Sequence, residues 1–226
     1  MTSASHPTIR QMAGAPLTTA LQPARTAVLV IDFQNEYFAA DPAIDHPGGR
    51  MVIPDGEAAL QQTHRVLTFA DRHGMRVIHV AHVLPAGAPL FAAGSSQAAF
   101  HPQMQPRAGE VVVEKDNVSV FAGASAAAID AALTAHGIDT LIITGLQTHA
   151  CVSGAARDAA AAPRGYRVIV VGDAVASRDL DLADGSRIDH RTLHAASLAT
   201  LEDTYAEVLS TAQLLALPVR VDVAAA

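Results

Sequence analysis

The sequence predicts an α/β fold of three layers, in which helices cover both faces of a six-stranded, mostly parallel, Rossmann-like sheet. Three observations support this prediction. Short apolar segments alternate along the chain with segments of helical length, as repeated βαβ units require. The apolar segments are continuous rather than alternating, which is typical of strands buried on both faces of a parallel sheet. Glycine follows several of the helical segments, where helices commonly end.

The elements follow one another in a regular order. An arm of residues 1–25, polar and aperiodic, precedes a single domain of residues 26–226. Six strands are expected, at residues 27–31, 76–84, 111–113, 140–144, 167–171 and 205–209. Helices are expected between or after them, at residues 58–73, 124–136, 151–162 and 189–201. Segments 37–54, 85–109 and 179–187 predict loops, because they are rich in Gly, Pro or Asp. Loops as long as segment 85–109 usually serve as lids or binding loops.

Composition narrows the class of protein. The 226 residues include 15 Lys+Arg and 22 Asp+Glu, a net charge of −7, and no basic cluster is present, so no nucleic-acid partner is expected. No apolar segment approaches the roughly 18 residues of a membrane helix, and the N-terminus lacks the apolar region of a secretory signal. The single cysteine cannot form an internal disulfide. We expect a soluble, cytoplasmic protein without membrane association.

Two common ligand motifs are absent. Neither the dinucleotide pattern G-x-G-x-x-G nor the phosphate-loop pattern G-x-x-x-x-G-K-[ST] follows a predicted strand. Both patterns place backbone amides around phosphate groups. The sequence therefore predicts no nucleotide cofactor, and we expect no cofactor at all.

Three chemically distinctive residues follow three different predicted strands. Lys115 is the only lysine beside 14 arginines, and Cys151 is the only cysteine. Asp32 directly follows the first strand. Because ligands bind at the carboxyl ends of parallel strands, we expect these three side chains to meet at one edge of the sheet.

These residue types complement one another in nucleophilic catalysis. A thiolate is the attacking form of cysteine, and a helix N-terminus or a nearby cation lowers its pKa, so we expect a lowered pKa for Cys151. Asp32 is placed to accept the thiol proton and to return it to a leaving group. Lys115 would supply a compact positive charge. This combination predicts acyl transfer through a thioester.

Three sequence blocks resemble one family. The blocks AVLVIDFQNEYF, VVVEKDNVSVFAG and LIITGLQTHACVSGAARDA…GYRVIVVGDAVASRD are similar to those of the isochorismatase-like cysteine hydrolases, which include nicotinamidases and N-carbamoylsarcosine amidase. The resemblance covers about residues 25–210. It implies a catalytic triad in which Asp32 is the general base, Cys151 the nucleophile and Lys115 the third member.

The resemblance also implies features of the surrounding pocket. A cis peptide at the Leu146–Gln147 bond would turn backbone amides inward, so that the N–H groups of Gln147 and Cys151 form the oxyanion hole. Tyr37 matches a position at which the family often has a pocket aromatic. His149 and Phe121 are further candidates from their positions near the nucleophile and the lysine, with structural or core roles as the alternatives.

The histidines predict no metal site. Nicotinamidases hold a metal through a D-x-H pattern in the loop after the first strand, and residues 33–54 contain no such pattern. His46, His79 and His82 are interpreted as satisfied or surface histidines. His190 and His194 have a spacing that suits zinc on a helix, but no third ligand is evident.

The sequence thus predicts a metal-independent hydrolase of small amide or ureido C–N bonds, acting as a homodimer or homotetramer. Three alternatives remain open. The first is vinyl-ether hydrolysis, as isochorismatases perform. The second is a non-catalytic binding module, which a slowly alkylated thiol would favour. The third is a redox-sensing role for the single thiol.

Overall fold

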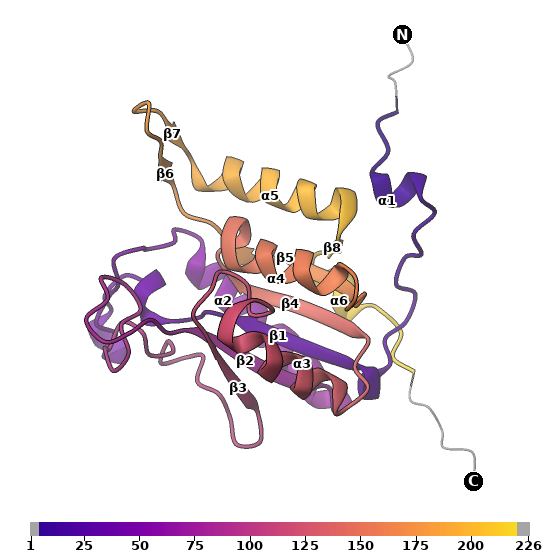
Figure 1. Cartoon of the computed structure of the whole chain (residues 1–226), viewed down its shortest axis with the longest axis horizontal. Coiled ribbons are helices and arrows are strands. Elements are labelled where there is room, and N and C mark those ends of the chain that lie inside the picture. The colour runs from indigo at the N-terminus through magenta and orange to yellow at the C-terminus, as the bar shows by residue number, and fades with distance from the viewer. Residues whose placement is uncertain (1–4, 221–226) are drawn as a thin grey trace.

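A six-stranded sheet forms the centre of the protein (Figure 1). The computed structural model describes residues 5–220. The strands lie in the order β3-β2-β1-β4-β5-β8, and every neighbouring pair is parallel. Their bounds are β1 Thr26–Ile31, β2 Arg76–His82, β3 Val111–Lys115, β4 Thr140–Leu146, β5 Arg167–Ala176 and β8 Glu207–Leu209. The predicted fold class is confirmed.

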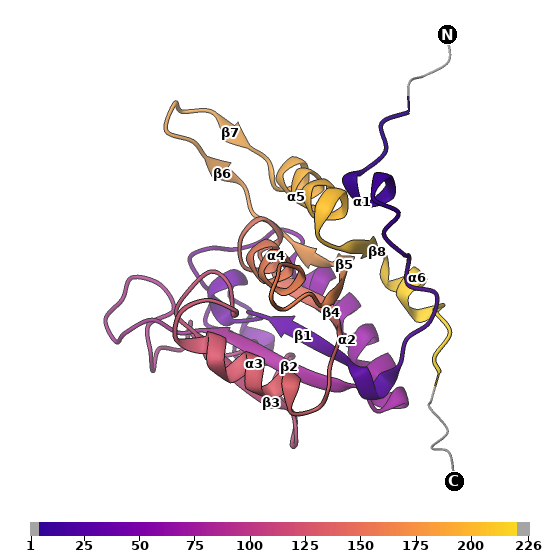
Figure 2. The same cartoon turned by 45° about the vertical axis from the view of Figure 1, so that its right-hand side comes forward.

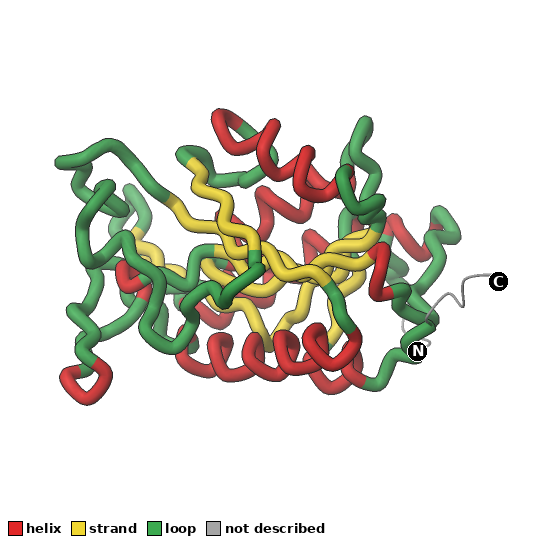
Figure 3. Tube along the Cα trace, turned by 90° about the horizontal axis from the view of Figure 1, so that it is seen from below, coloured by secondary structure: helices red, strands yellow, loops and turns green. Residues whose placement is uncertain are grey.

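Helices lie on both sides of the strands, which gives the expected three layers (Figure 3). One face packs against α2 (Gly56–His73) and α6 (Thr211–Leu215), and the other against α3 (Ala126–Thr134), α4 (Ser153–Ala160) and α5 (His190–Thr204). Successive residues of β1 alternate between these two cores: Val28 belongs to the first and Leu29 to the second. Because both faces are covered, β1 is buried throughout. This explains its continuous apolar sequence.

The order of the strands fixes where a ligand would bind. The chain builds β2 and β3 on one side of β1, and β4, β5 and β8 on the other. The direction of growth thus reverses between β1 and β4, and open α/β sheets bind ligands at the carboxyl ends of strands at such a switch point. Asp32 follows β1 and Cys151 follows β4, so both lie at this point.

The described part of the N-terminal arm contacts the domain. Helix α1 (Ile9–Met12) lies beside α5, and the Ile9 N–H donates to Asp203. The backbone N–H and hydroxyl of Thr18 both donate to the buried carboxylate of Glu207. These contacts hold the arm against β8 and α5. The division into an arm of residues 1–25 and one domain of residues 26–226 stays a prediction.

Two elements were not expected from the sequence. Residues 179–187 form a hairpin of β6 (Leu180–Asp181) and β7 (Arg187–Ile188) rather than a loop, and Figure 2 shows it standing away from the sheet. Its turn contains Gly185 at a φ of +84°, which favours glycine. The second unexpected element is α6, which begins with a capping box between Ser210 and Gln213.

The long segment after β2 is irregular, as predicted. Residues 83–110 contain no helix or strand. Side chains from the turn after β1 hold this segment, since Gln34 donates to the Ala98 carbonyl and Asn35 to the Ser96 carbonyl. Among residues 5–220, no helix combines the length and apolar character that crossing a membrane requires.

Candidate active site

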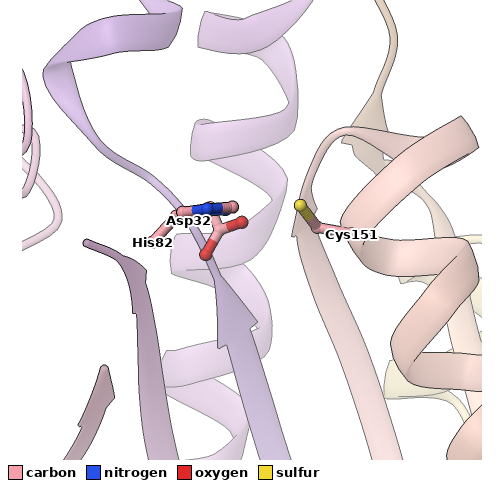
Figure 4. A group of neighbouring side chains, drawn as sticks. All are labelled: Asp32, His82 and Cys151. Carbon is pink, nitrogen blue, oxygen red and sulfur yellow. The ribbon is translucent and has the colours of Figure 1, made fainter. Parts of the chain in front are cut away.

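Asp32, Lys115 and Cys151 meet at the carboxyl edge of the sheet, as the sequence predicts. Asp32 follows β1, Lys115 ends β3, and Cys151 lies in a π-helical turn of residues Thr148–Val152 between β4 and α4. Asp32 is fully buried, Lys115 is 2% exposed and Cys151 is 4% exposed. Figure 4 shows the Cys151 sulfur facing the Asp32 carboxylate and the ring of His82.

The Lys115 ammonium is the centre of the cluster. Its Nζ lies 2.9 Å from Asp32 Oδ2, 3.0 Å from His82 Nδ1, 3.1 Å from the Asn117 carbonyl oxygen and 3.3 Å from Cys151 Sγ. Strand β2 lies between β3 and β1, so the Lys115 side chain has to cross the end of β2 to reach Asp32. The ammonium thus serves four acceptors with three N–H groups.

The Asp32 carboxylate is held so that it is free to accept a proton. Its backbone has a φ of +53°, a left-handed conformation that costs of order 1–3 kcal/mol in residues other than glycine and that clusters at functional sites. Apart from the ion pair with Lys115, neither carboxylate oxygen accepts a regular hydrogen bond from residues 5–220. An unused acceptor therefore lies near the thiol.

The Cys151 thiol is protonated in the resting site. Burial and the negative charge of Asp32 raise its pKa to about 12, although Lys115 acts in the opposite direction. The expectation of a lowered pKa was therefore wrong. The positive charge of Lys115 is already balanced by the negative charge of Asp32. A thiolate would add a second buried negative charge without a counter-charge. Slow alkylation at neutral pH consequently does not distinguish a binding module from an enzyme.

The protonated state of Lys115 is secured by the same partners. Burial lowers its pKa, but the charge of Asp32 and the hydrogen bonds to Asp32 and Cys151 raise it, and the net direction is above the ordinary value. The site therefore holds one ammonium, one carboxylate and one neutral thiol. These charges sum to zero. A proton that moves from the thiol to the carboxylate leaves that sum unchanged.

An unusual peptide bond precedes the turn that carries Cys151. The Leu146–Gln147 peptide is cis, as the resemblance implied. No hydrogen bond among the described residues is donated by the Gln147 N–H. It is therefore an available donor four residues before Cys151. The assignment of an oxyanion hole to Gln147 and Cys151 stays a prediction.

The three candidate pocket residues differ in their surroundings. Tyr37 is buried, and burial together with the nearby Cys151 and Asp32 raises its pKa well above 10.0, although Gln147 and Arg178 act in the opposite direction. His149 is half-buried, and its Nδ1 lies 3.1 Å from Ser177 Oγ. The ring of Phe121 contacts Tyr166 and Arg164, which is the environment of a packing residue.

The sequence analysis considered five histidines as possible metal ligands. Four of them contact residues other than Asp32, Lys115 and Cys151. His79 is buried against Glu110 at 3.0 Å, and His46 packs beside Phe38 and His101. His190 binds Asp179 at 2.8 Å, whereas His194 binds the Thr148 hydroxyl at 2.9 Å, so this pair does not share a ligand. His82 is the exception.

His82 and Arg178 are the site residues that sequence reasoning missed. His82 was interpreted as satisfied or on the surface, but it contacts Lys115 directly. Its position in the chain could have identified it. His82 ends β2, and β2 lies between β3, which carries Lys115, and β1, which precedes Asp32. Arg178 is half-buried just after β5, its Nε is buried without a partner among the described residues, and its charge acts on both Tyr37 and His149.

One group of side chains has the chemistry of a metal site. Among residues 5–220, only Asp32, His82 and Cys151 bring three potential ligand atoms within 4.8 Å of one another. The Lys115 ammonium contacts all three. A metal ion would have to displace a cation that these groups already bind.

Comparisons with known proteins show the family of this chain. Residues 26–213 match the family model described as Isochorismatase domain, and the chain belongs to the isochorismatase family of hydrolases. It is 31% identical to the secreted isochorismatase effector Isc1 of Verticillium dahliae (89% of this chain, 95% of that protein). It is 30% identical to the maleamate amidohydrolase of Pseudomonas putida (82% and 83%).

Solved structures support the same assignment. A putative isochorismatase hydrolase from Oleispira antarctica matches with a TM-score of 0.76 and 33% identity, covering 85% of this chain and 97% of that one. Relatives in the family act on amides and on ureido compounds. The expected class of enzyme, a hydrolase, is confirmed.

Proposed function

We propose that the protein hydrolyses the C–N bond of a small amide or ureido compound through a thioester on Cys151. The observation that carries this proposal is the contact of one ammonium with a carboxylate and a thiol, all buried at the switch point of the sheet. A thiol near an acceptor that is otherwise unused is the arrangement that nucleophilic catalysis by cysteine requires.

The reaction begins with one proton transfer. Asp32 takes the thiol proton, and the sulfur attacks the substrate carbonyl carbon, forming an S–C bond and placing a negative charge on the oxygen. The N–H groups of Gln147 and Cys151 stabilise this oxyanion. Asp32 then gives the proton to the nitrogen, and the C–N bond breaks to release ammonia or an amine. Water, activated by Asp32, hydrolyses the thioester.

Lys115 stabilises each charged state of this sequence. Before the transfer its ammonium pairs with the Asp32 carboxylate, and afterwards it faces the thiolate at the 3.3 Å contact. Attraction between opposite charges is strong in a site from which water is excluded. The transfer thus replaces one ion pair with another around a single fixed cation.

Arg178 favours a substrate with a carboxylate group. Its half-buried guanidinium has an Nε without a partner among residues 5–220 and lies near the aromatic residue Tyr37, which itself contacts Gln147. Guanidinium groups bind carboxylates in a planar, two-point geometry. We infer that the substrate carries an acidic group one short spacer away from the scissile bond. Maleamate, the compound in the name of one relative, has this chemistry.

A screen for ammonia release tests the proposed function. Maleamate, ureido acids, nicotinamide and simple neutral amides are incubated with the wild type and with Cys151→Ala. We expect release from a carboxylate-bearing amide, lowered by about 10³-fold or more in the variant because the nucleophile is lost. Circular dichroism checks that the variant folds. Full activity of folded Cys151→Ala would exclude the thioester.

A second prediction tests the role of Arg178. Arg178→Gln is expected to raise KM for the acidic amide by about 10- to 100-fold, the size of a lost hydrogen bond to a charged group, and to affect a neutral amide little. Arg187→Gln is the matched control, because Arg187 lies in the neighbouring hairpin and pairs with Asp181. Equal losses on both kinds of amide would contradict the assignment.

Isochorismate, assayed for pyruvate in place of ammonia with the same two proteins, tests the alternative reaction. Vinyl-ether hydrolysis of isochorismate would release pyruvate without ammonia, and its persistence in Cys151→Ala would favour that activity. The cytoplasmic location stays a prediction. The assembly into a homodimer or homotetramer also stays a prediction, which light scattering on the purified protein tests.

A further inference from the structure

His82, the last residue of β2, contacts the Lys115 ammonium through its ring. Its Nδ1 lies 3.0 Å from Lys115 Nζ. An ammonium has only donors, so Nδ1 is the acceptor and the ring proton resides on Nε2. The ring is half-buried. His82 is thus one of the acceptors that fix the position of the ammonium between Asp32 and Cys151.

The His82 residue is itself held on two sides. The Gln34 side chain binds its backbone at both polar atoms: Oε1 accepts from the His82 N–H at 2.8 Å, and Nε2 donates to the His82 carbonyl at 2.9 Å. The ring stacks on Phe91 with a centroid distance of 4.9 Å and an angle of 19° between the planes. These contacts fix both the backbone and the plane of the imidazole, which a freely rotating surface histidine would not need.

We propose that His82 is a positioning residue that holds the Lys115 ammonium in contact with both Asp32 and Cys151. This inference rests on the proposed function, because it assigns the ammonium to the thiol-to-carboxylate proton transfer. Without His82, the long lysine side chain keeps only the Asn117 carbonyl as an acceptor outside the reacting pair. The ammonium then follows whichever of the two reacting groups is charged, and its contact with the other is lost.

The charge state of His82 agrees with this role. The groups that face it are Lys115 and Asp116 from the end of β3, Asp32 from the end of β1, and Cys151 from the turn after β4. Burial and the Lys115 charge lower the pKa of His82 below 6.5, although Asp32 and Asp116 act in the opposite direction. The ring is therefore neutral at pH 7 and able to accept. In acid it gains a proton, loses the acceptor at Nδ1 and repels the ammonium.

Three variants test the proposal. His82→Leu removes the acceptor, whereas His82→Asn restores an oxygen near the position of Nδ1 without a titratable ring. His79→Leu is the matched control, because His79 is a buried histidine of the same strand that pairs with Glu110 outside the site. We expect His82→Leu to lower kcat for the acidic amide hydrolysed fastest in the screen by about 10- to 100-fold with little change in KM. His82→Asn recovers part of this loss and falls off less in acid than the wild type.

The single lysine gives a readout that does not depend on turnover. In protein labelled with ¹⁵Nζ-lysine, Lys115 supplies the only side-chain ammonium signal. We expect this signal to shift and to exchange faster with water in His82→Leu, and to stay at its wild-type position in His79→Leu. An unchanged signal and kcat in folded His82→Leu would overturn the proposal, as would a His82→Asn variant as impaired as His82→Leu. Neither outcome touches the thioester, which Cys151→Ala tests separately.

Discussion

Replacing Asp32 with Asn is expected to change turnover and thiol reactivity in opposite directions. General acid–base catalysis contributes about 10²- to 10⁴-fold, and kcat should fall by that amount. The Asp32 charge is one cause of the raised pKa of Cys151, after burial, so its removal lowers this pKa. Cys151 should therefore react faster with iodoacetamide at pH 8, by about tenfold for each unit of pKa lost.

A second carboxylate supplies the control for this experiment. Asp173 lies in β5 and accepts from the backbone N–H and the hydroxyl of Thr211 in α6, outside the cluster of Asp32, Lys115 and Cys151. Asp173→Asn should leave both turnover and alkylation unchanged. Slower alkylation in Asp32→Asn than in the wild type would mean that Asp32 stabilises the thiolate, and would contradict its role as the base.

Replacing Lys115 with Met is expected to destabilise the protein by about 3–5 kcal/mol, since it leaves a buried carboxylate without its counter-charge. Both partners are almost fully buried. The double variant Asp32→Asn/Lys115→Met should recover most of the lost stability, because neither charge remains. Urea unfolding of the four proteins measures this coupling. If the two single effects simply add in the double variant, the ion pair is not the cause.

The fold was predictable because its central strands, β1 and β4, are buried on both faces. Segments such as 27–31 and 141–143 are apolar without interruption, a pattern that is typical of a covered parallel sheet. The hairpin of residues 179–187 was not predictable from apolar content. It buries little, and turn geometry at Gly185 defines it instead.

The meeting of Asp32, Lys115 and Cys151 was predictable because the single lysine, the single cysteine and an aspartate all fall at strand ends. The role of His82 and the pKa of Cys151 were not predicted, because both depend on which residues lie close together in the folded protein. His82 became a neighbour of Lys115 only once β2 was known to separate β3 from β1. The pKa of Cys151 also required three dimensions, since composition and chain position do not show how fully a thiol is removed from water.

The zero net charge of the buried cluster has a consequence for the energetics of the first step. In the proposed mechanism the proton leaves sulfur for oxygen, so the negative charge changes place within the cluster but no net charge enters or leaves the protein interior. Mobile ions in the solvent also sense almost no change in field from this step. We therefore expect the rate of this proposed proton transfer to depend little on ionic strength.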